Sequence, residues 1–309
     1  MTTVGDSIFQ KLEQAGFRVR TVSITRLPVV QEAVTRLVRQ GMISETLHRD
    51  WHFYLDANKD LPAAKTIFIV AIPQPVARAR FEWHGISYPA DFPPGIFVRA
   101  DESHAGEILG SVLKSAGYSV VKAHLALKTL AVRSGLARYG RNNITYVPGI
   151  GSFHRLIAFY SDCPCEIDSW QEVQAMDACE KCTICRENCP AGSITSDRFL
   201  IRAENCHIFS DSEKDASWWL GLDRRNTLVG CMVCQNVCPA NRLYLNKITD
   251  GPIFSISETE LILNGTPCTN LPSGTKQKLD RLAEDGIYPV LVRNLKTFMT
   301  GPDLRQYAP

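Results

Sequence analysis

The stretch CEKCTICRENCP, residues 179–190, decides which kind of fold this chain adopts. Its four cysteines follow the pattern C-x2-C-x2-C-x3-C-P, by which bacterial ferredoxins hold one 4Fe-4S cluster with three thiolates and lend the fourth to a neighbouring cluster. A tight loop can point three sulfur atoms at one cube, while the turn at Pro190 directs the fourth away from it. The stretch therefore predicts a ferredoxin-like domain with two clusters.

A second stretch, GCMVCQNVCPAN at residues 230–241, repeats this motif without its first cysteine, whose position is taken by Leu228. Crossing the fourth ligands predicts one cluster on Cys179, Cys182, Cys185 and Cys238, and another on Cys189, Cys231, Cys234 and one further residue. Cys206 is the best candidate for that residue because it lies between the two stretches. His207, Cys268 and Cys163 are the alternatives, since histidine also serves as an iron-sulfur ligand.

Zinc is the alternative metal for such cysteines. Structural zinc sites pair one C-x2-C with a distant second one, and zinc chemistry does not require a third close cysteine followed by C-P. The spacing therefore favours clusters over zinc. Outside the array, Cys163-Pro164-Cys165 forms either a redox pair, a reactive thiol or two ordinary thiols of a reducing compartment.

Composition excludes several other classes of protein. The 309 residues carry a formal charge of +2, with 34 basic and 32 acidic side chains interspersed and no polybasic tail. The N-terminal residues lack the pattern of a secretion signal, and no apolar stretch approaches the length that spans a bilayer. We therefore expect a cytoplasmic protein that has no membrane partner and uses its eleven cysteines mainly for metal ligation.

The remaining sequence predicts a mixed architecture. Helices are expected at residues 6–16 and 125–134, and the apolar run TIFIVAI at 66–72 is typical of a strand buried on both faces. Residues 73–95, rich in proline and aromatic side chains, are expected to form a long loop or lid, and PVLV at 289–292 a strand. We divide the chain into an α/β cofactor-binding domain at 1–162, the double-cluster domain at 163–250 and a C-terminal extension at 251–309.

The α/β half lacks a G-x-G-x-x-G motif after a strand and a phosphate-binding G-x4-G-K-[ST] loop, so nucleotide-driven chemistry is not predicted. Instead, LKTLAVRSGLARYGRNNITYVPGIGSFHRLIAFYSD at 127–162, joined to the two cysteine stretches, resembles epoxyqueuosine reductase and the corrinoid-dependent reductive dehalogenases. The order of elements over residues 5–245 is similar to that of these families.

The resemblance implies an α+β fold in which a nitroreductase-like α/β corrinoid-binding domain precedes the ferredoxin-like domain. Cobalamin would lie between these modules and take electrons from the clusters. As catalytic residues the resemblance suggests Tyr139, Arg141 and His154, and for the cofactor it suggests Gly135, Gly140, Asn142, Asn143, Gly151 and Ser152.

Three departures from epoxyqueuosine reductase are visible. The stretch SVVKAHLALK at 119–128 lacks the family's acidic proton donor, Arg141 replaces a lysine, and 309 residues leave no room for the C-terminal helical repeat that contacts tRNA. These departures predict that tRNA is not the partner of this chain.

The leading hypothesis is therefore a corrinoid-dependent iron-sulfur oxidoreductase. It would receive electrons from a low-potential donor of ferredoxin or flavodoxin type and either reduce a small organic substrate or reactivate a partner corrinoid protein. One alternative is an electron-transfer protein without corrinoid. Another is an epoxyqueuosine reductase of tRNA queuosine synthesis.

Overall fold

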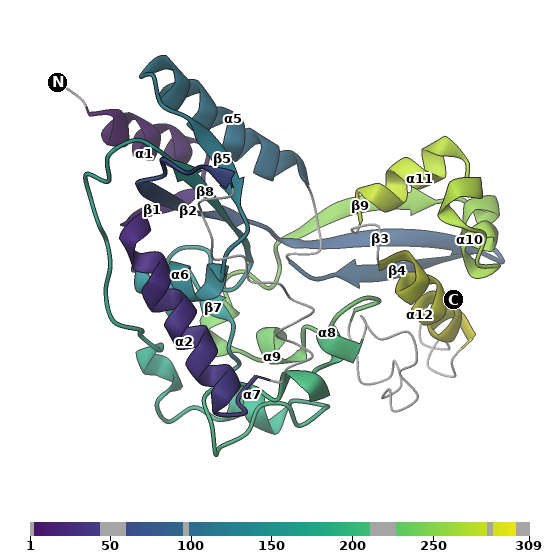
Figure 1. The fold of residues 1–309 in the computed structure, drawn as a ribbon. Helices are drawn as coiled ribbons and strands as arrows, with labels where there is room; N and C mark the ends of the chain where they lie inside the picture. Colours follow the sequence, from purple (N-terminus) through teal and green to yellow (C-terminus); the bar gives the residue numbers. More distant parts are fainter. Residues whose placement is uncertain (1–2, 44–59, 95–98, 211–226, 283–286, 301–309) are drawn as a thin grey trace. The chain divides into compact units, whose positions relative to one another are not determined.

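The computed structural model describes residues 3–43, 60–94, 99–210, 227–282 and 287–300 (Figure 1). The chain divides into two compact units, one of residues 1–73 and 99–182 and the other of residues 74–98 and 183–309. Both helices and strands occur in each unit, so the predicted mixed α+β class is confirmed. Within the described residues no helix is both long and apolar enough to cross a membrane.

The first unit is built on an antiparallel sheet with the strand order β1-β2-β8-β5. These strands span Arg18–Ser23 (β1), Thr66–Pro73 (β2), His154–Ser161 (β8) and Val120–Ala123 (β5). The residues of β2 from Thr66 to Ile72 are all buried, as the sequence predicted for a strand covered on both faces. Alternate side chains of β2 and β8 belong to two different hydrophobic clusters, so the sheet separates two cores.

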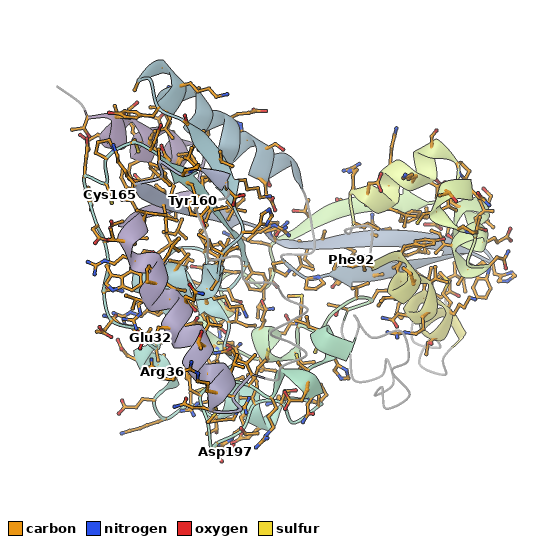
Figure 2. All side chains as sticks on the ribbon, viewed as in Figure 1. Glu32, Arg36, Phe92, Tyr160, Cys165 and Asp197 are labelled. Atoms are coloured by element: carbon orange, nitrogen blue, oxygen red, sulfur yellow. The ribbon has the colours of Figure 1, made fainter. Side chains whose placement is uncertain are left out.

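Helices cover both faces of this sheet. α1 (Val4–Gln14) and α5 (Arg99–Ser115) pack on one face, and α2 (Leu27–Arg39) and α6 (Leu127–Arg133) on the other. α1 begins two residues earlier than expected because Thr3 caps it, accepting the Asp6 N–H while the Asp6 carboxylate accepts the Thr3 N–H. Tyr160 of β8, labelled in Figure 2, is one of the largest fully buried side chains of the unit.

Two short strands, β6 (Arg138–Tyr139) and β7 (Thr145–Tyr146), form a hairpin after α6. This hairpin and the turn that follows it at residues 147–151 carry most of the residues predicted to contact a cofactor. The first unit also contains two short 3₁₀ helices, η1 (Ile24–Arg26) and η2 (Asp177–Cys179).

The second unit contains a sheet with the order β4-β3-β9. β3 (Val76–Trp83) and β4 (Ile86–Phe92) pair as a hairpin, while β9 (Ile248–Phe254) runs parallel to β3. The helices α10 (Ile256–Leu263), α11 (Ser273–Asp280) and α12 (Tyr288–Thr300) form one core with it, into which Phe92, labelled in Figure 2, is fully buried. The shorter helices are α7 (Ile184–Glu187), α8 (His207–Ser210), α9 (Val233–Asn236), η3 (Ala203–Asn205), η5 (Pro239–Asn241) and η6 (Cys268–Asn270).

Two sequence-based expectations for this unit are wrong. Within the expected loop at 73–95, residues 76–92 form the β3–β4 hairpin, because His84 and Gly85 both adopt positive φ angles and close a tight turn. Pro89 is accommodated because β4 is an edge strand. Residues 289–292 belong to α12, whose first turn tolerates Pro289 and whose buried Leu291 and Leu295 are spaced by one helical turn.

The division into compact units also differs from the predicted domains at 1–162, 163–250 and 251–309. Residues 74–98 belong with the C-terminal part of the chain because β3 pairs with β9 from Val76 to Phe81. The three modules remain a prediction about function.

Candidate functional site

The parts of the two cysteine stretches that lie in the second unit have the same local structure. Cys185 is the second residue of the four-residue helix α7, and Cys234 is the second residue of the four-residue helix α9. The two helices contact each other. This pairing gives the two stretches the pseudo-symmetric arrangement expected of a double-cluster domain.

The other predicted ligands lie in η2 or in segments without regular secondary structure. Cys179 ends η2 and Cys182 follows it in the first unit, while the second unit holds Cys189, Cys206, Cys231 and Cys238. All eleven cysteines are free, and of the eight predicted ligands only Cys185 is buried. The accessible thiols fit metal ligation better than core packing.

Leu228 explains why the second stretch lacks its first cysteine. Its side chain is buried in the hydrophobic core of the second unit. Its backbone is held from both sides, since its N–H donates to the Asp91 carbonyl and its carbonyl accepts a hydrogen bond from the Asn294 side chain. Position 228 therefore belongs to the core and not to a ligand loop.

The alternatives for the last ligand occupy different surroundings. Cys206 directly follows η3, and His207 beside it is buried. Cys268 packs against the core of the second unit, and Cys163 is buried in the first. Among the described residues no three cysteine, histidine or acidic side chains are grouped to hold a single metal ion. In a 4Fe-4S cluster each thiolate binds a different iron atom, so its ligands need not be grouped around one point. Cys206 therefore stays the predicted last ligand.

The predicted cofactor residues of the β6–β7 hairpin are largely engaged with one another. A Cβ atom on Gly140 would lie 2.5 Å from Cε2 of Tyr146 and 2.6 Å from Oδ1 of Asn142. The buried Asn142 amide donates to the Tyr146 hydroxyl at 3.1 Å and accepts the Ile144 N–H at 3.3 Å. Glycine is required at position 140 by the packing of the protein's own atoms.

His154 is held just as completely. Because the Gly151 carbonyl can only accept, Nδ1 carries the proton and donates to it at 3.1 Å, and Nε2 accepts from the Thr145 hydroxyl at 3.0 Å. Burial lowers the pKa of His154 from 6.5 to about 4, opposed by the bond to Gly151 and assisted by the charge of Lys128. The imidazole is therefore neutral near pH 7, a state in which it cannot donate a proton as imidazolium.

The remaining predicted residues of this region also have structural surroundings. Burial raises the pKa of Tyr139, whose hydroxyl lies 3.3 Å from that of Thr129. Gly135 follows the C-cap of α6 with a φ of 70°, and Ser152 is buried. The catalytic roles predicted for Tyr139, Arg141 and His154 stay predictions.

Two side chains of the hairpin differ from the rest. Arg141 and Asn143 each carry a buried nitrogen, Nε and Nδ2 respectively, for which the described residues offer no hydrogen-bond partner. Asn143 also adopts a φ of 60°, a conformation that asparagine tolerates better than most residues. Since a buried donor without a partner costs free energy, these two nitrogens are the candidate donors to a ligand in this hairpin.

Arg141 uses its other end to reach the first cysteine stretch. Its Nη2 donates to the Cys179 carbonyl at 2.6 Å and to the Glu180 carbonyl at 3.2 Å. The Tyr139 N–H donates to the Gln174 carbonyl, and the Tyr139 carbonyl accepts the Met176 N–H, each at 2.9 Å. The hairpin and residues 174–180, hereafter the cluster loop, are thus joined along their length.

A buried carboxylate escaped the sequence analysis. Glu102 of α5 is paired with Lys122 of β5 and Arg155 of β8. Arg155 and His154 are consecutive on a strand, so their side chains point to opposite faces of the sheet. Glu102 therefore lies on the face of the sheet opposite His154, and no local motif marked it because its partners come from distant parts of the chain.

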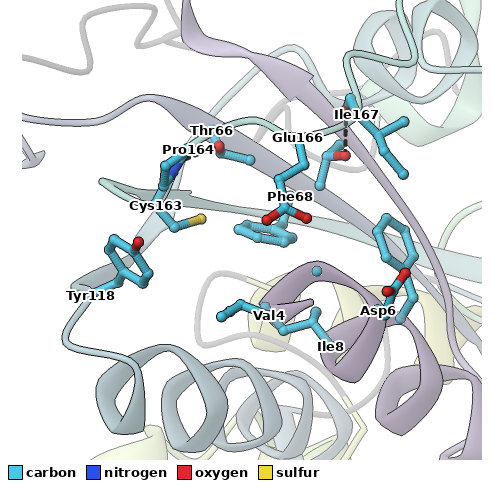
Figure 3. A pocket seen from close by; sticks show the side chains of 13 residues that line it. Val4, Asp6, Ile8, Thr66, Phe68, Tyr118, Cys163, Pro164, Glu166 and Ile167 are labelled. Carbon is cyan, nitrogen blue, oxygen red and sulfur yellow. Dashed lines mark hydrogen bonds between the residues drawn. The ribbon is translucent and has the colours of Figure 1, made fainter. Parts of the chain in front are cut away.

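A cavity of about 70 Å³ lies in the first unit beside the Cys163-Pro164-Cys165 segment (Figure 3). The Cys163 side chain points into it between Phe68 and Tyr118. The Thr66 hydroxyl holds the Cys163 carbonyl at 2.7 Å. Burial raises the pKa of the neighbouring Cys165 thiol, which favours the unreactive protonated form.

Comparison with known proteins agrees with the cysteine array. Residues 178–241 match the family described as a 4Fe-4S double cluster binding domain. The chain therefore contains a 4Fe-4S cluster-binding domain. Over 123 residues it is 31% identical to epoxyqueuosine reductase of Staphylococcus aureus. This aligned stretch covers 38% of this chain and 30% of the relative. The match thus spans about a third of that relative's length.

Solved structures show the same fold. Epoxyqueuosine reductase from Streptococcus thermophilus superposes with a TM-score of 0.63 and 17% identity, covering 93% of this chain and 78% of that one. An epoxyqueuosine reductase solved with a tRNA-Tyr epoxyqueuosine-modified tRNA stem loop gives a TM-score of 0.60 and 19% identity, covering 94% and 80%. The resemblance to epoxyqueuosine reductase is confirmed, and these relatives agree with the prediction of an oxidoreductase.

Two sequence-based hypotheses are corrected by these findings. The leading hypothesis, a corrinoid-dependent oxidoreductase for small substrates or for corrinoid reactivation, is wrong, because the similar proteins are epoxyqueuosine reductases. The argument against tRNA is also wrong, since one protein of this fold was solved with a tRNA stem loop. Both errors came from giving weight to single substituted positions and to chain length. These two features do not alter the fold that the rest of the sequence encodes.

Proposed function

We propose that this chain reduces epoxyqueuosine in tRNA. Converting an epoxide to an alkene takes two electrons and two protons and releases the oxygen as water. The observation that carries the proposal is that the likeness to epoxyqueuosine reductase extends over 93% of the chain. It thus includes the α/β unit as well as the cluster region, which many redox proteins share.

The double-cluster domain would supply the electrons. We assign one cluster to Cys179, Cys182, Cys185 and Cys238, and the other to Cys189, Cys206, Cys231 and Cys234. Each cluster passes one electron at a time. The matching positions of Cys185 and Cys234 in the contacting helices α7 and α9 support this assignment.

We extend the proposal to cobalamin as the group that meets the substrate, in a nitroreductase-like α/β domain. The residues fit it in one respect: Asn143 Nδ2 and Arg141 Nε are buried donors that find no partner in the described part of the chain, and propionamide oxygens of a corrinoid are acceptors. When bound, cobalamin supplies a cobalt centre that can be reduced to a strongly nucleophilic state. Asn143 would donate to a propionamide at the edge of the corrinoid, while Gly140, Asn142 and His154 maintain the conformation of the hairpin.

The test is an anaerobic reaction of the protein reconstituted with iron, sulfide and cobalamin. An epoxyqueuosine-containing tRNA stem loop is incubated with this protein and dithionite, and the nucleosides are analysed by mass spectrometry. We expect loss of one oxygen atom from the modified base, and binding of the stem loop that weakens with salt. Cys182→Ser should abolish the reaction, whereas Cys165→Ser, outside the array, should not. A loaded protein that neither binds the stem loop at low salt nor changes the nucleoside would rule the proposal out.

A further inference from the structure

The guanidinium of Arg141 lies against the backbone of a predicted cluster ligand. Its Nη2 donates to the carbonyl oxygens of both Cys179 and Glu180, at 2.6 and 3.2 Å, and so spans consecutive peptide groups at the end of η2. Its Nε is buried. A partly buried guanidinium is screened by water less than an exposed one, so its charge acts more strongly on what lies beside it.

The other arginine of the hairpin provides a comparison within the same element. Arg138 pairs with Asp177 of the cluster loop at 2.8 Å, but the two side chains are 47% and 89% exposed. Its charge is both neutralised by the partner and screened by solvent. Among the described residues no carboxylate pairs with Arg141, and its charge faces the carbonyl of Cys179 instead.

We infer that Arg141 is a positioning residue for the cluster bound by Cys179, fixing the cluster loop through two carbonyls and raising the reduction potential of that one cluster. The inference rests on the 4Fe-4S domain and does not depend on the substrate. A cluster with four thiolate ligands is an anion, and it becomes more negative by one charge when a donor gives it one electron. A nearby positive charge stabilises the reduced form more than the oxidised form, so the potential rises.

Reduction potentials and cluster retention test this inference without any substrate. Arg141→Gln removes the charge and shortens the donor, while Arg141→Lys keeps the charge but replaces the planar guanidinium, whose Nη2 donates to both carbonyls, with a shorter ammonium group. In redox titrations of the reconstituted protein followed by electron paramagnetic resonance, we expect Arg141→Gln to lower the potential of one cluster and leave the other unchanged. Arg141→Lys should restore that potential.

The rate of cluster release tests separately whether Arg141 fixes the cluster loop. When an iron chelator is added to the oxidised protein, both variants should release the iron of one cluster roughly tenfold faster than the unmodified protein, as expected for losing one charge-assisted hydrogen bond. Arg138→Gln, which removes the same type of charge from the same hairpin, should change neither the potential nor the release rate.

Three outcomes would overturn the inference. One is an unchanged potential and release rate in Arg141→Gln, another is an equal shift of both clusters, and the third is an equal shift in Arg138→Gln. If Arg141→Gln fails to load a cluster, Arg141→Lys decides: a wild-type potential with faster release supports the inference, and wild-type release contradicts it. Failure of tRNA reduction with these potentials intact would count against the proposed function alone.

Discussion

The β6–β7 hairpin has two sides that use their polar groups differently. On one side, Asn142, Thr145 and His154 bond to neighbours in the first unit, and Gly140 leaves no room for a side chain. On the other side, Arg141 and Asn143 keep a buried donor each without a partner in the described chain. A glycine-rich and amide-rich stretch thus contains both structural residues and residues available to a ligand, and only their partners separate the two groups.

The largest effect is expected at His154. Because burial lowers its folded-state pKa to about 4, the unfolded chain, with a pKa near 6.5, takes up the proton first as the pH falls. The stability contributed by the neutral ring is complete above pH 6.5 and is lost as the pH falls toward 4, by up to about 3 kcal/mol. Anaerobic urea unfolding of the protein and of His154→Gln over this range measures it.

His104 is the matched control for that experiment, since its side chain is 56% exposed. His104→Gln should keep the pH dependence of the unmodified protein, and His154→Gln should remove most of it. Parallel loss of stability in all three proteins would show that His154 is not the group responsible.

Gly140→Ala should have the next largest effect, on the same side of the hairpin. The added methyl group would meet the buried Tyr146 ring and the Asn142 side chain well inside contact distance, so we expect a loss of about 1–3 kcal/mol in the free energy of unfolding. Gly274→Ala is the control, because a Cβ there meets no atom within 4 Å and α11 favours alanine. Equal stability of Gly140→Ala and the unmodified protein would remove Gly140 from the structural side.

Asn143→Gly tests the other side. Glycine adopts the φ of 60° without strain, and the substitution removes a buried amide nitrogen for which the described residues offer no partner. The cobalamin-free protein should therefore gain up to about 1 kcal/mol in unfolding free energy, while cobalamin retained on gel filtration should decrease. A variant that retains cobalamin as well as the unmodified protein would place Asn143 among the structural residues.

The smallest effect is expected for Arg138→Gln. Both members of the Arg138–Asp177 pair are largely exposed, and such pairs contribute less than about 1 kcal/mol. Unfolding at low and high salt should give nearly the same result for this variant and the unmodified protein. A salt-dependent loss larger than that would show that the cluster loop depends on Arg138 as well as Arg141.

The structural side of the hairpin was beyond the reach of sequence reasoning. Composition marked Gly140, Asn142 and His154 as candidate cofactor contacts because glycine and amide groups suit a ligand. The same residue types also suit a tight hairpin, and their partners Tyr146, Thr145 and Gly151 become evident only when the chain is folded.

The sequence by itself determined the cluster domain and the buried strand at 66–72, because cysteine spacing and continuous apolar runs are properties of neighbouring residues. Tertiary structure alone decided that residues 76–92 form a hairpin against β9, that residues 289–292 are helical and that Leu228 is a core residue. It also decided that Arg141 reaches Cys179. These outcomes depend on burial and on partners far along the chain, which local patterns do not encode.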